Sequence, residues 1–162
     1  MAPVLFRIDE RLLHGQVIVG WGMRLGLKRY LVVDDELAGS QWEQDLYSAG
    51  LPPGVSVRFL SVGDALGQLP EFVSLPGPGA VLTRSTSSMR LLAEANLLAG
   101  CRVNVGGLHE GEGRRTALRY VSLRSDEAED LRAIESAGAN VGARDLPTSR
   151  EVGLEELLSA ID

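Results

Sequence analysis

The chain has 162 residues, of which 44% are hydrophobic and 23% charged, and 22 acidic against 16 basic side chains give it a net charge of −6. This length predicts one domain, residues 1–162, whose core is large enough to fold without disulfides or metal ions. The acidic balance argues against a protein that binds nucleic acid or anionic lipid, and the single cysteine, Cys101, excludes a disulfide framework and is compatible with the cytoplasm.

Hydropathy and the distribution of charge add three expectations. Arg7 follows so short an apolar stretch that we expect no signal peptide, and no run of about 18 apolar residues predicts a membrane span. Residues 1–30 carry five basic and two acidic side chains, a net charge of +3, which leaves −9 for the remainder. This asymmetry indicates either one anion-facing site or a chance fluctuation in a short window.

Short β-branched runs alternate with helical patterns along the chain. The predicted strands are residues 4–8, 30–33, 55–60, 80–83, 101–105, 120–123 and 139–144. Several are almost continuously apolar, which is typical of parallel strands covered on both faces. We therefore expect a doubly wound α/β fold: a mainly parallel sheet of about seven strands with helices on both faces.

The helical patterns have recognisable ends. Ser61 and Ser125 are predicted to cap two helices, the first ending at Leu69 before Pro70 and the second ending at a left-handed Gly138. Apolar residues at helical spacing predict a last helix over residues 154–161. Segments rich in glycine and proline are expected to be loops at residues 69–79 and 106–115.

A further helix is predicted from about Gly15 to Leu25. Its apolar residues extend beyond one stripe, because Val19 and Met23 lie away from the side that carries Val17, Ile18, Trp21 and Leu25. Core packing on two sides explains this pattern most simply. The alternative is a partner-docking patch beside His14.

The strongest chemical signal is the segment RIDERLLHGQ, residues 7–16. It leaves the first strand at its carboxyl end, where open α/β sheets bind ligands, and enters a helix near Gly15. The N–H groups at this helix start, at Gly15 and Gln16, are expected to bind phosphate, together with the guanidinium forks of Arg7 and Arg11. His14 adds an imidazole that is nucleophilic near pH 7. The combination is what phosphoryl transfer to histidine requires.

Spacing alone leaves other interpretations open. His14 can equally be a structural histidine, Arg7 a solvated charge, and Asp9 with Arg11 a plain loop ion pair. His109 has no second ligand at metal-binding spacing, so we expect no metal, and Cys101 is expected to be a small buried hydrophobe. The fingerprints of P-loop, dinucleotide-binding and α/β-hydrolase proteins are absent, so no cofactor is expected.

Residues 7–17, RIDERLLHGQV, resemble the active-site segment of the enzyme IIB components of the mannose/fructose/sorbose class of the bacterial phosphoenolpyruvate-dependent sugar phosphotransferase system. The resemblance continues through VDDE at 33–36, PPGV at 52–55, NVGG at 104–107 and RDLP at 144–147, and so covers essentially the whole chain. It implies a parallel α/β sheet and a cytoplasmic protein held peripherally at the inner membrane by its partners.

The resemblance also implies roles for residues. His14 would accept a phosphoryl group from a phosphohistidine on enzyme IIA and pass it to a sugar moved by the membrane components IIC and IID. This activity is that of a protein-N(pi)-phosphohistidine–sugar phosphotransferase. By the same resemblance Arg7 and Arg11 would bind the phosphoryl oxygens, and Asp9 would orient the loop.

The chain departs from the family pattern at two places. TRSTSS at residues 83–88 stands where a Thr-Asn-Pro stretch is common, and Ser149 replaces a familiar acid. The first departure keeps open a regulatory or sensory module that is phosphorylated on His14 without sugar transport. A flavodoxin-like small-molecule binder is disfavoured because no cofactor fingerprint appears. The identity of the sugar and a homodimer are left open.

Overall fold

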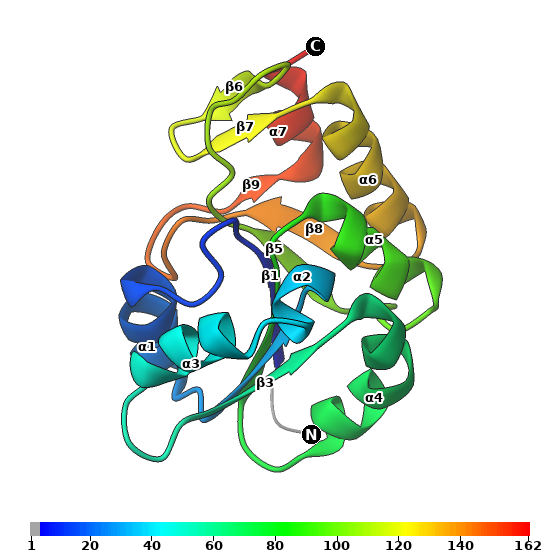
Figure 1. The fold of residues 1–162 in the computed structure, drawn as a ribbon. Helices are drawn as coiled ribbons and strands as arrows, with labels where there is room; N and C mark the ends of the chain where they lie inside the picture. The colour runs from blue at the N-terminus through cyan, green and yellow to red at the C-terminus, as the bar shows by residue number, and fades with distance from the viewer. Residues whose placement is uncertain (1–3) are drawn as a thin grey trace.

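The computed structural model describes residues 4–162, so residues 1–3, part of the start on which the signal-peptide expectation depends, lie outside the described residues. Seven strands form one sheet in the order β3-β2-β4-β1-β5-β8-β9 (Figure 1), and every neighbouring pair is parallel except β8 with β9. The strands are β1 (Val4–Ile8), β2 (Arg29–Val33), β3 (Ser56–Leu60), β4 (Gly79–Thr83), β5 (Arg102–Val105), β8 (Asn140–Ala143) and β9 (Val152–Gly153). The predicted sheet is confirmed.

One predicted strand lies outside this sheet. β7 (Val121–Leu123) pairs antiparallel with β6 (Arg115–Leu118) in a separate two-stranded sheet. Only two residues separate the two strands, and so short a connection permits a hairpin but not a parallel crossover. The seventh place in the main sheet belongs to β9, which the sequence analysis did not identify.

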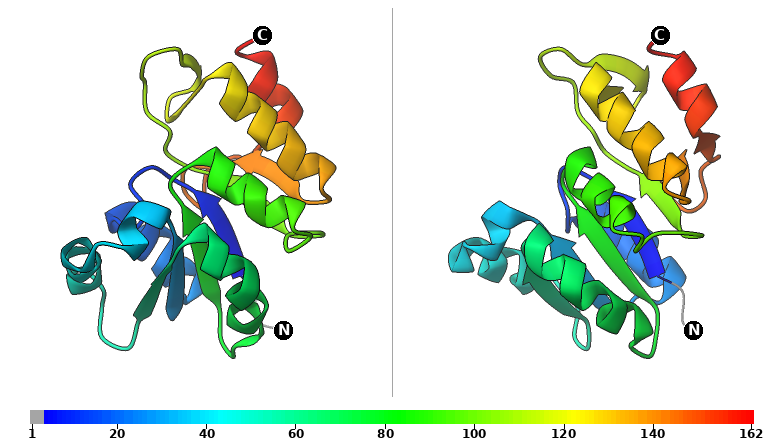
Figure 2. Two further views of the ribbon diagram at one scale, coloured as in Figure 1. Left: turned by 45° about the vertical axis from the view of Figure 1, so that its right-hand side comes forward. Right: turned by 90° about the vertical axis from the view of Figure 1, so that its right-hand side faces the viewer.

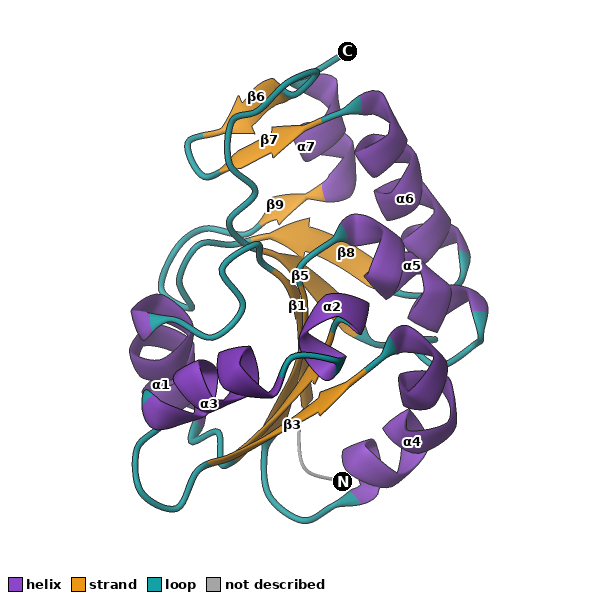
Figure 3. Ribbon diagram, in the orientation of Figure 1, coloured by secondary structure: helices purple, strands orange, loops and turns teal. Residues whose placement is uncertain are grey.

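Helices cover both faces of the sheet, as Figures 2 and 3 show. On one side lie η1 (Gln16–Trp21), α1 (Gly22–Leu25) and α3 (Gln41–Ala49); on the other lie α4 (Val62–Ser74), α5 (Thr86–Glu94) and α6 (Ser125–Ser136). The short α2 (Asp35–Ala38) follows β2, and α7 (Leu154–Ser159) packs beside β8. Within residues 4–162, no helix has both the length and the apolarity that crossing a membrane needs.

Two predicted helix ends were wrong. The helix capped by Ser61 continues through Pro70 to Ser74, so residues 69–74 are helical rather than a loop. Proline costs one helical hydrogen bond there, but Leu69 and Phe72 on either side of it are buried, and their burial offsets that cost. The Ser61 cap itself is confirmed, because its hydroxyl accepts the Asp64 N–H at 3.1 Å.

The start of α6 also differs from prediction. Its N-cap is Arg124, not Ser125, and the Glu127 carboxylate accepts the Arg124 backbone N–H at 2.9 Å. Glu127 thus supplies the returning half of a capping box. The predicted left-handed stop is confirmed at Gly138, whose φ is 103°.

The alternation of side chains along the strands sorts them into two cores. Leu31 and Val33 of β2 pack in the core beneath α4, α5 and α6, whereas Val32 packs in the core beneath η1 and α3. In β1, Phe6 and Ile8 face the first core. Arg7 must therefore point toward the η1 side, where it is fully buried. This placement excludes the solvated-charge interpretation of Arg7.

Candidate active site

The loop that carries the predicted site leaves the carboxyl end of β1, between β4 and β5. Asp9 donates its N–H to the Thr83 carbonyl at the end of β4, and Glu10 donates its N–H to the Gly107 carbonyl after β5, both at 2.9 Å. The chain winds toward one edge of the sheet after β1 and toward the other after β4. Such a reversal of winding is where open α/β sheets bind ligands.

A left-handed residue sets the course of this loop. Leu12 has φ 54° and donates its N–H to the Asp9 carbonyl at 3.0 Å, which closes a tight turn. This conformation is strained for a residue with a β-carbon, and it persists because Leu12 and Leu13 are both buried. Their burial brings His14 to the surface, where 16% of its side chain is exposed.

Asp9 gathers the other predicted side chains around one buried carboxylate. Its Oδ2 lies 3.1 Å from Nη2 of Arg7 and 3.2 Å from Nε2 of His14. Its Oδ1 accepts the Arg11 backbone N–H at 3.0 Å and lies 3.6 Å from the Arg11 Nε. The structure thus brings together four residues that the sequence analysis selected.

The charge on Asp9 indicates which ring nitrogen of His14 carries a proton. Burial alone would raise the pKa of Asp9, but the His14 hydrogen bond and the Arg7 charge outweigh burial and hold it well below its usual range. Burial lowers the pKa of Arg7 while Asp9 acts to raise it. Since an ionised carboxylate only accepts hydrogen bonds, the contact requires Nε2–H on His14 and leaves Nδ1 as the ring nitrogen that Asp9 does not hold.

Arg7 is held by residues that the sequence analysis missed. Its Nη1 donates to the side-chain oxygen of Asn104 and, at 2.9 Å, to the Arg144 carbonyl, while Nη2 lies 3.3 Å from the Asp145 carbonyl. The Trp21 ring packs on the guanidinium, 5.1 Å from its carbon to the ring centroid. Asn104 stands opposite Arg7 in the β1–β5 register, so the missing signal was strand order.

Two glycines leave room for these side chains. A β-carbon on Gly106 would collide with the guanidinium of Arg7, and one on Gly107 would lie 3.3 Å from the Asp9 carboxylate. The first two glycines of the predicted 106–115 loop therefore pack against charged side chains of the β1 loop, where a side chain of their own would not fit.

The three remaining predicted phosphate ligands differ in accessibility. Arg11 is 44% exposed at its side chain and donates to the Gln16 amide oxygen at 3.1 Å. Gln16 in turn donates to Oδ1 of Asp145 at 2.8 Å, so both ends of its amide have protein partners. Gly15 is exposed, and a β-carbon there would meet nothing within 4 Å. Phosphate binding by Gly15 and Gln16 stays a prediction.

An apolar groove of about 560 Å³ opens beside His14. Helix η1 forms one side and α3 forms the other. Trp42 and Leu46 of α3 are 67% and 64% exposed, and Val19 of η1 is 58% exposed. The groove is lined by Leu13, His14, Gly15, Ile18, Val19, Trp42, Glu43, Leu46, Tyr47 and Gly50. Part of the predicted 15–25 helix is therefore core, through Val17 and Trp21, and part is open apolar surface.

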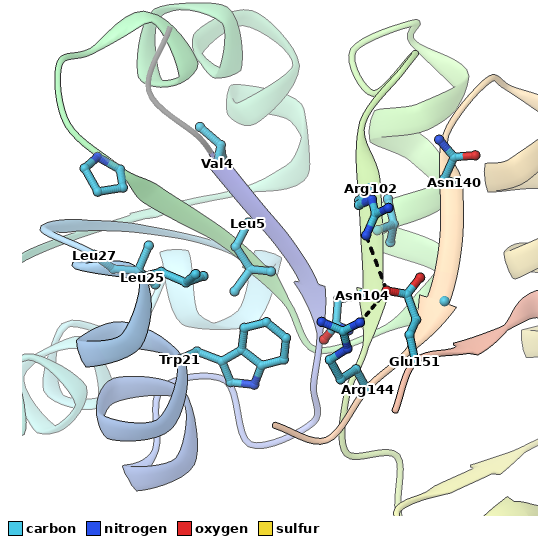
Figure 4. Close-up of a pocket in the computed structure, with 13 residues that line it drawn as sticks. Val4, Leu5, Trp21, Leu25, Leu27, Arg102, Asn104, Asn140, Arg144 and Glu151 are labelled. Carbon is cyan, nitrogen blue, oxygen red and sulfur yellow. Dashed lines mark hydrogen bonds and ion pairs between the residues drawn. The ribbon is translucent and has the colours of Figure 1, made fainter. Parts of the chain in front are cut away.

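A second hollow, of about 210 Å³, lies on the other side of α1, and Figure 4 shows its two walls. Trp21, Leu25 and Leu27 form the apolar wall. On the polar wall, Glu151 pairs with Arg102 at 3.4 Å and Arg144 at 3.1 Å. Arg102 and Arg144 thus share one carboxylate on this wall, while Trp21, which packs on Arg7, lines the opposite wall.

His109 and Cys101, the other candidates from the sequence, lie outside the cluster around Asp9. Nδ1 of His109 lies 3.0 Å from the Glu10 carboxylate, and its side chain is 56% exposed. Cys101 is half-buried rather than buried, and burial raises its thiol pKa, which disfavours a reactive thiolate. Across residues 4–162, no group of three or more His, Cys, Asp or Glu side chains is placed to hold a metal ion.

The unusual TRSTSS segment starts a helix. The Ser85 hydroxyl accepts the Ser88 N–H at 3.1 Å and caps α5, and Thr86 donates to Asp130 at 2.7 Å. Arg84 lies 3.6 Å from Asp34, which follows β2. The segment adjoins the site through the Thr83 carbonyl that holds Asp9.

Comparison with known proteins identifies the family of the chain. Residues 3–161 match the family model of the PTS system sorbose subfamily IIB component. The N-acetylgalactosamine-specific phosphotransferase enzyme IIB component 2 of Escherichia coli K12 is 30% identical over 155 residues, which cover 96% of this chain and 98% of that protein. The mannose-specific EIIAB component of the same strain is 28% identical over 160 residues, 98% of this chain but 49% of that longer protein.

Solved structures show the same fold. The crystal structure of manxB from Thermoanaerobacter tengcongensis superposes with a TM-score of 0.85 at 27% identity and covers 98% of this chain and 96% of that one. Family model, sequence relatives and fold agree over nearly the whole chain. The chain therefore belongs to the sorbose subfamily of IIB components, which take part in phosphoryl transfer in sugar phosphotransferase systems.

Proposed function

We propose that the chain is a single-domain phosphocarrier that accepts a phosphoryl group on His14 from a phosphohistidine of enzyme IIA. It then passes the group to a sugar carried by the membrane components IIC and IID, at whose cytoplasmic face it docks. The observation that carries the proposal is the Arg7–Asp9–His14 cluster. It fixes the imidazole by its Nε2 at a half-buried position and leaves Nδ1 free for phosphorus.

In the first step, the Nδ1 lone pair of His14 attacks phosphorus in line, and the phosphorus–nitrogen bond of the donor breaks. The donor imidazole leaves with the bonding electron pair. His14 then carries a positive charge on its phosphorylated ring, and the ionised Asp9 stabilises that charge through Nε2–H. Catalysis of this kind depends on positioning and charge.

In the second step, a sugar hydroxyl oxygen attacks the same phosphorus, and the phosphorus–Nδ1 bond breaks. The imidazole recovers its electron pair, while the hydroxyl proton passes to solvent water. Arg11, 44% exposed beside Asp9, is the arginine positioned to contact phosphoryl oxygens directly. Both terminal nitrogens of Arg7 already donate to protein acceptors. Arg7 therefore assists phosphate binding through its positive charge and by holding Asp9 in place.

The groove beside His14 supports a protein as the donor. A phosphohistidine on another protein reaches His14 only if that protein covers the surrounding surface. The surface there is apolar, because Trp42, Leu46 and Val19 are exposed in the groove. Aromatic side chains on such docking surfaces commonly supply much of the binding energy of an interface. The groove thus favours the docking-patch alternative for the exposed part of η1.

The test is phosphoryl transfer from phosphoenolpyruvate through enzyme I, HPr and a cognate IIA. We expect the wild type to take up one equivalent of acid-labile phosphate and His14→Ala to take up none. His109→Ala is the matched control, because it removes the second histidine of the chain and should leave one equivalent. Equal labelling of His14→Ala and wild type would show that His14 is not the acceptor.

A second arm adds membranes that contain IIC and IID. Sugar phosphate formed only when His14 is present supports a transport component. Complete phosphorylation of His14 with no transfer to any of mannose, fructose, sorbose or N-acetylgalactosamine would support the regulatory alternative instead.

A further inference from the structure

A network of charged side chains lies beside the loop residues 9–14 and has no part in the chemistry proposed above. It begins at Glu10, the residue after Asp9, and reaches the start of α6. Glu10 Oε2 accepts the His109 backbone N–H at 3.3 Å and lies 3.0 Å from the His109 Nδ1. Its Oε1 accepts a hydrogen bond from Nη1 of Arg114. The side chain of Glu10 therefore ties the β1 loop to residues 106–114.

Arg114 carries the network onward to α6. Its Nε and Nη2 donate to the two carboxylate oxygens of Glu127 at 2.9 and 2.7 Å, a two-pronged pair. Its Nη1 also donates to the His109 carbonyl at 2.7 Å. Only 12% of the Arg114 side chain and 5% of the Glu127 side chain are exposed, so this pair is little screened by solvent.

Glu127 is itself fixed. One of its oxygens accepts the Arg124 backbone N–H at 2.9 Å, which caps α6. The Glu127 hydrogen bonds are the largest influence on Arg114, whose pKa they raise against the opposing effect of burial. Glu10, Arg114 and Glu127 thus link the loop residues 9–14 to the capped N-terminus of α6, and we name these three residues the brace.

We propose that Arg114 is a positioning residue for phosphoryl transfer, acting through the brace. Asp9 and Glu10 are consecutive, and their carboxylates are held by different partners: Arg7 and His14 hold Asp9, whereas Arg114 and His109 hold Glu10. Anchoring both side chains fixes the peptide between them, and with it the Asp9 carboxylate that orients His14. The inference rests on the proposed role of His14, because positioning matters only if His14 is the acceptor.

The experiment measures single-turnover phosphate uptake from phosphorylated IIA over a range of donor concentrations, well below the unfolding temperature. We expect Arg114→Met to lower the maximal rate roughly 10- to 100-fold, the range typical for supporting partners, while the half-saturating donor concentration changes less than about twofold. Glu10→Gln should also lower the maximal rate, but by a smaller factor. Arg114→Lys, which keeps the charge but loses the fork, should recover part of the rate.

The matched control is Arg150→Met, which breaks an arginine–glutamate pair of similar length, 2.8 Å, on the exposed surface. It should leave the rate unchanged. A second readout is the ¹⁵N spectrum of the His14 ring, where loss of the brace should broaden or shift Nε2. A purely structural brace would lower the melting temperature and leave both readouts at wild-type values.

The outcomes separate cleanly. An unchanged maximal rate and ring spectrum in Arg114→Met and Glu10→Gln would overturn the proposal. If Arg114→Met does not fold, Glu10→Gln and Arg114→Lys decide by the same two readouts. Failure of the proposed function appears elsewhere, as phosphate uptake by His14→Ala, and so is not confused with failure of the brace.

Discussion

Asp9 and Glu10 are chemically alike and adjacent, yet the fold gives them opposite surroundings. The Asp9 side chain is fully buried against Arg7, Arg11 and His14, while Glu10 is 25% exposed and faces Arg114 and His109. The His14 hydrogen bond and the Arg7 charge outweigh burial and lower the pKa of Asp9, so its carboxylate stays ionised and accepts the His14 N–H. In the proposed mechanism, Asp9 orients His14 and Glu10 attaches the loop, so two successive residues carry the two tasks.

The largest expected effect comes from removing the charge at Asp9. Asp9→Asn keeps the shape but loses the acceptor that fixes Nε2–H of His14, so the ring can turn or change tautomer. We expect the single-turnover rate of phosphate uptake to fall by on the order of 10³–10⁴, the scale seen when a carboxylate that orients a histidine is neutralised. Glu10→Gln should lose far less. If the uptake rate falls equally in the two variants, Asp9 and Glu10 do not have different tasks.

The next effect is on stability. Arg7→Met leaves the Asp9 carboxylate buried without its arginine, so we expect the free energy of unfolding in urea to fall by about 3–5 kcal/mol. Arg150→Met, at an exposed pair, is the control and should hardly move the urea midpoint. A small effect of Arg7→Met would mean that the Asp9 carboxylate does not depend on Arg7 for its stability in the folded chain.

The pH dependence of stability tests the same carboxylate. The pKa of Asp9 is lower in the folded chain than its unfolded value of about 3.9, so the stabilisation it confers is present above that value. The stabilisation begins to decline as the pH falls below the unfolded value and is fully lost once the pH has fallen through the folded pKa, so pH 3 lies inside this window. Wild type should therefore lose more stability than Asp9→Asn when urea unfolding is compared at pH 7 and pH 3. The prediction fails if both lose the same amount.

The smallest effect on the molecule itself is expected in the groove. Trp42→Ala removes an exposed ring, so unfolding should change by no more than about 0.5 kcal/mol. The half-saturating concentration of phosphorylated IIA should rise roughly tenfold, with the maximal rate retained. Leu91→Ala, an exposed apolar residue on α5 at the opposite face, is the control. If the half-saturating concentration changes equally in the two variants, the groove is not the surface that binds the donor.

The sequence supported most of the main sheet and the centre of the site. The β-branched runs predicted six of its seven strands, and the order RIDERLLHGQ placed two arginines, an aspartate and a histidine at a strand end. The errors share one cause. The helix through Pro70 and the place of β7 depend on burial and pairing with distant segments, which local propensity does not contain.

The sequence by itself determined the α/β class, the loop after the first strand and the resemblance that names His14, because periodicity and short motifs are local properties. Only the tertiary structure decided that Arg7 is buried, that Asn104 and Asp145 hold it, and that Glu10 reaches Arg114. These partners lie about 100 residues or more from the loop along the chain and meet it only because β5 lies beside β1 and β8 lies beside β5. Strand order, set by the packing of two apolar cores, brings these partners to the loop.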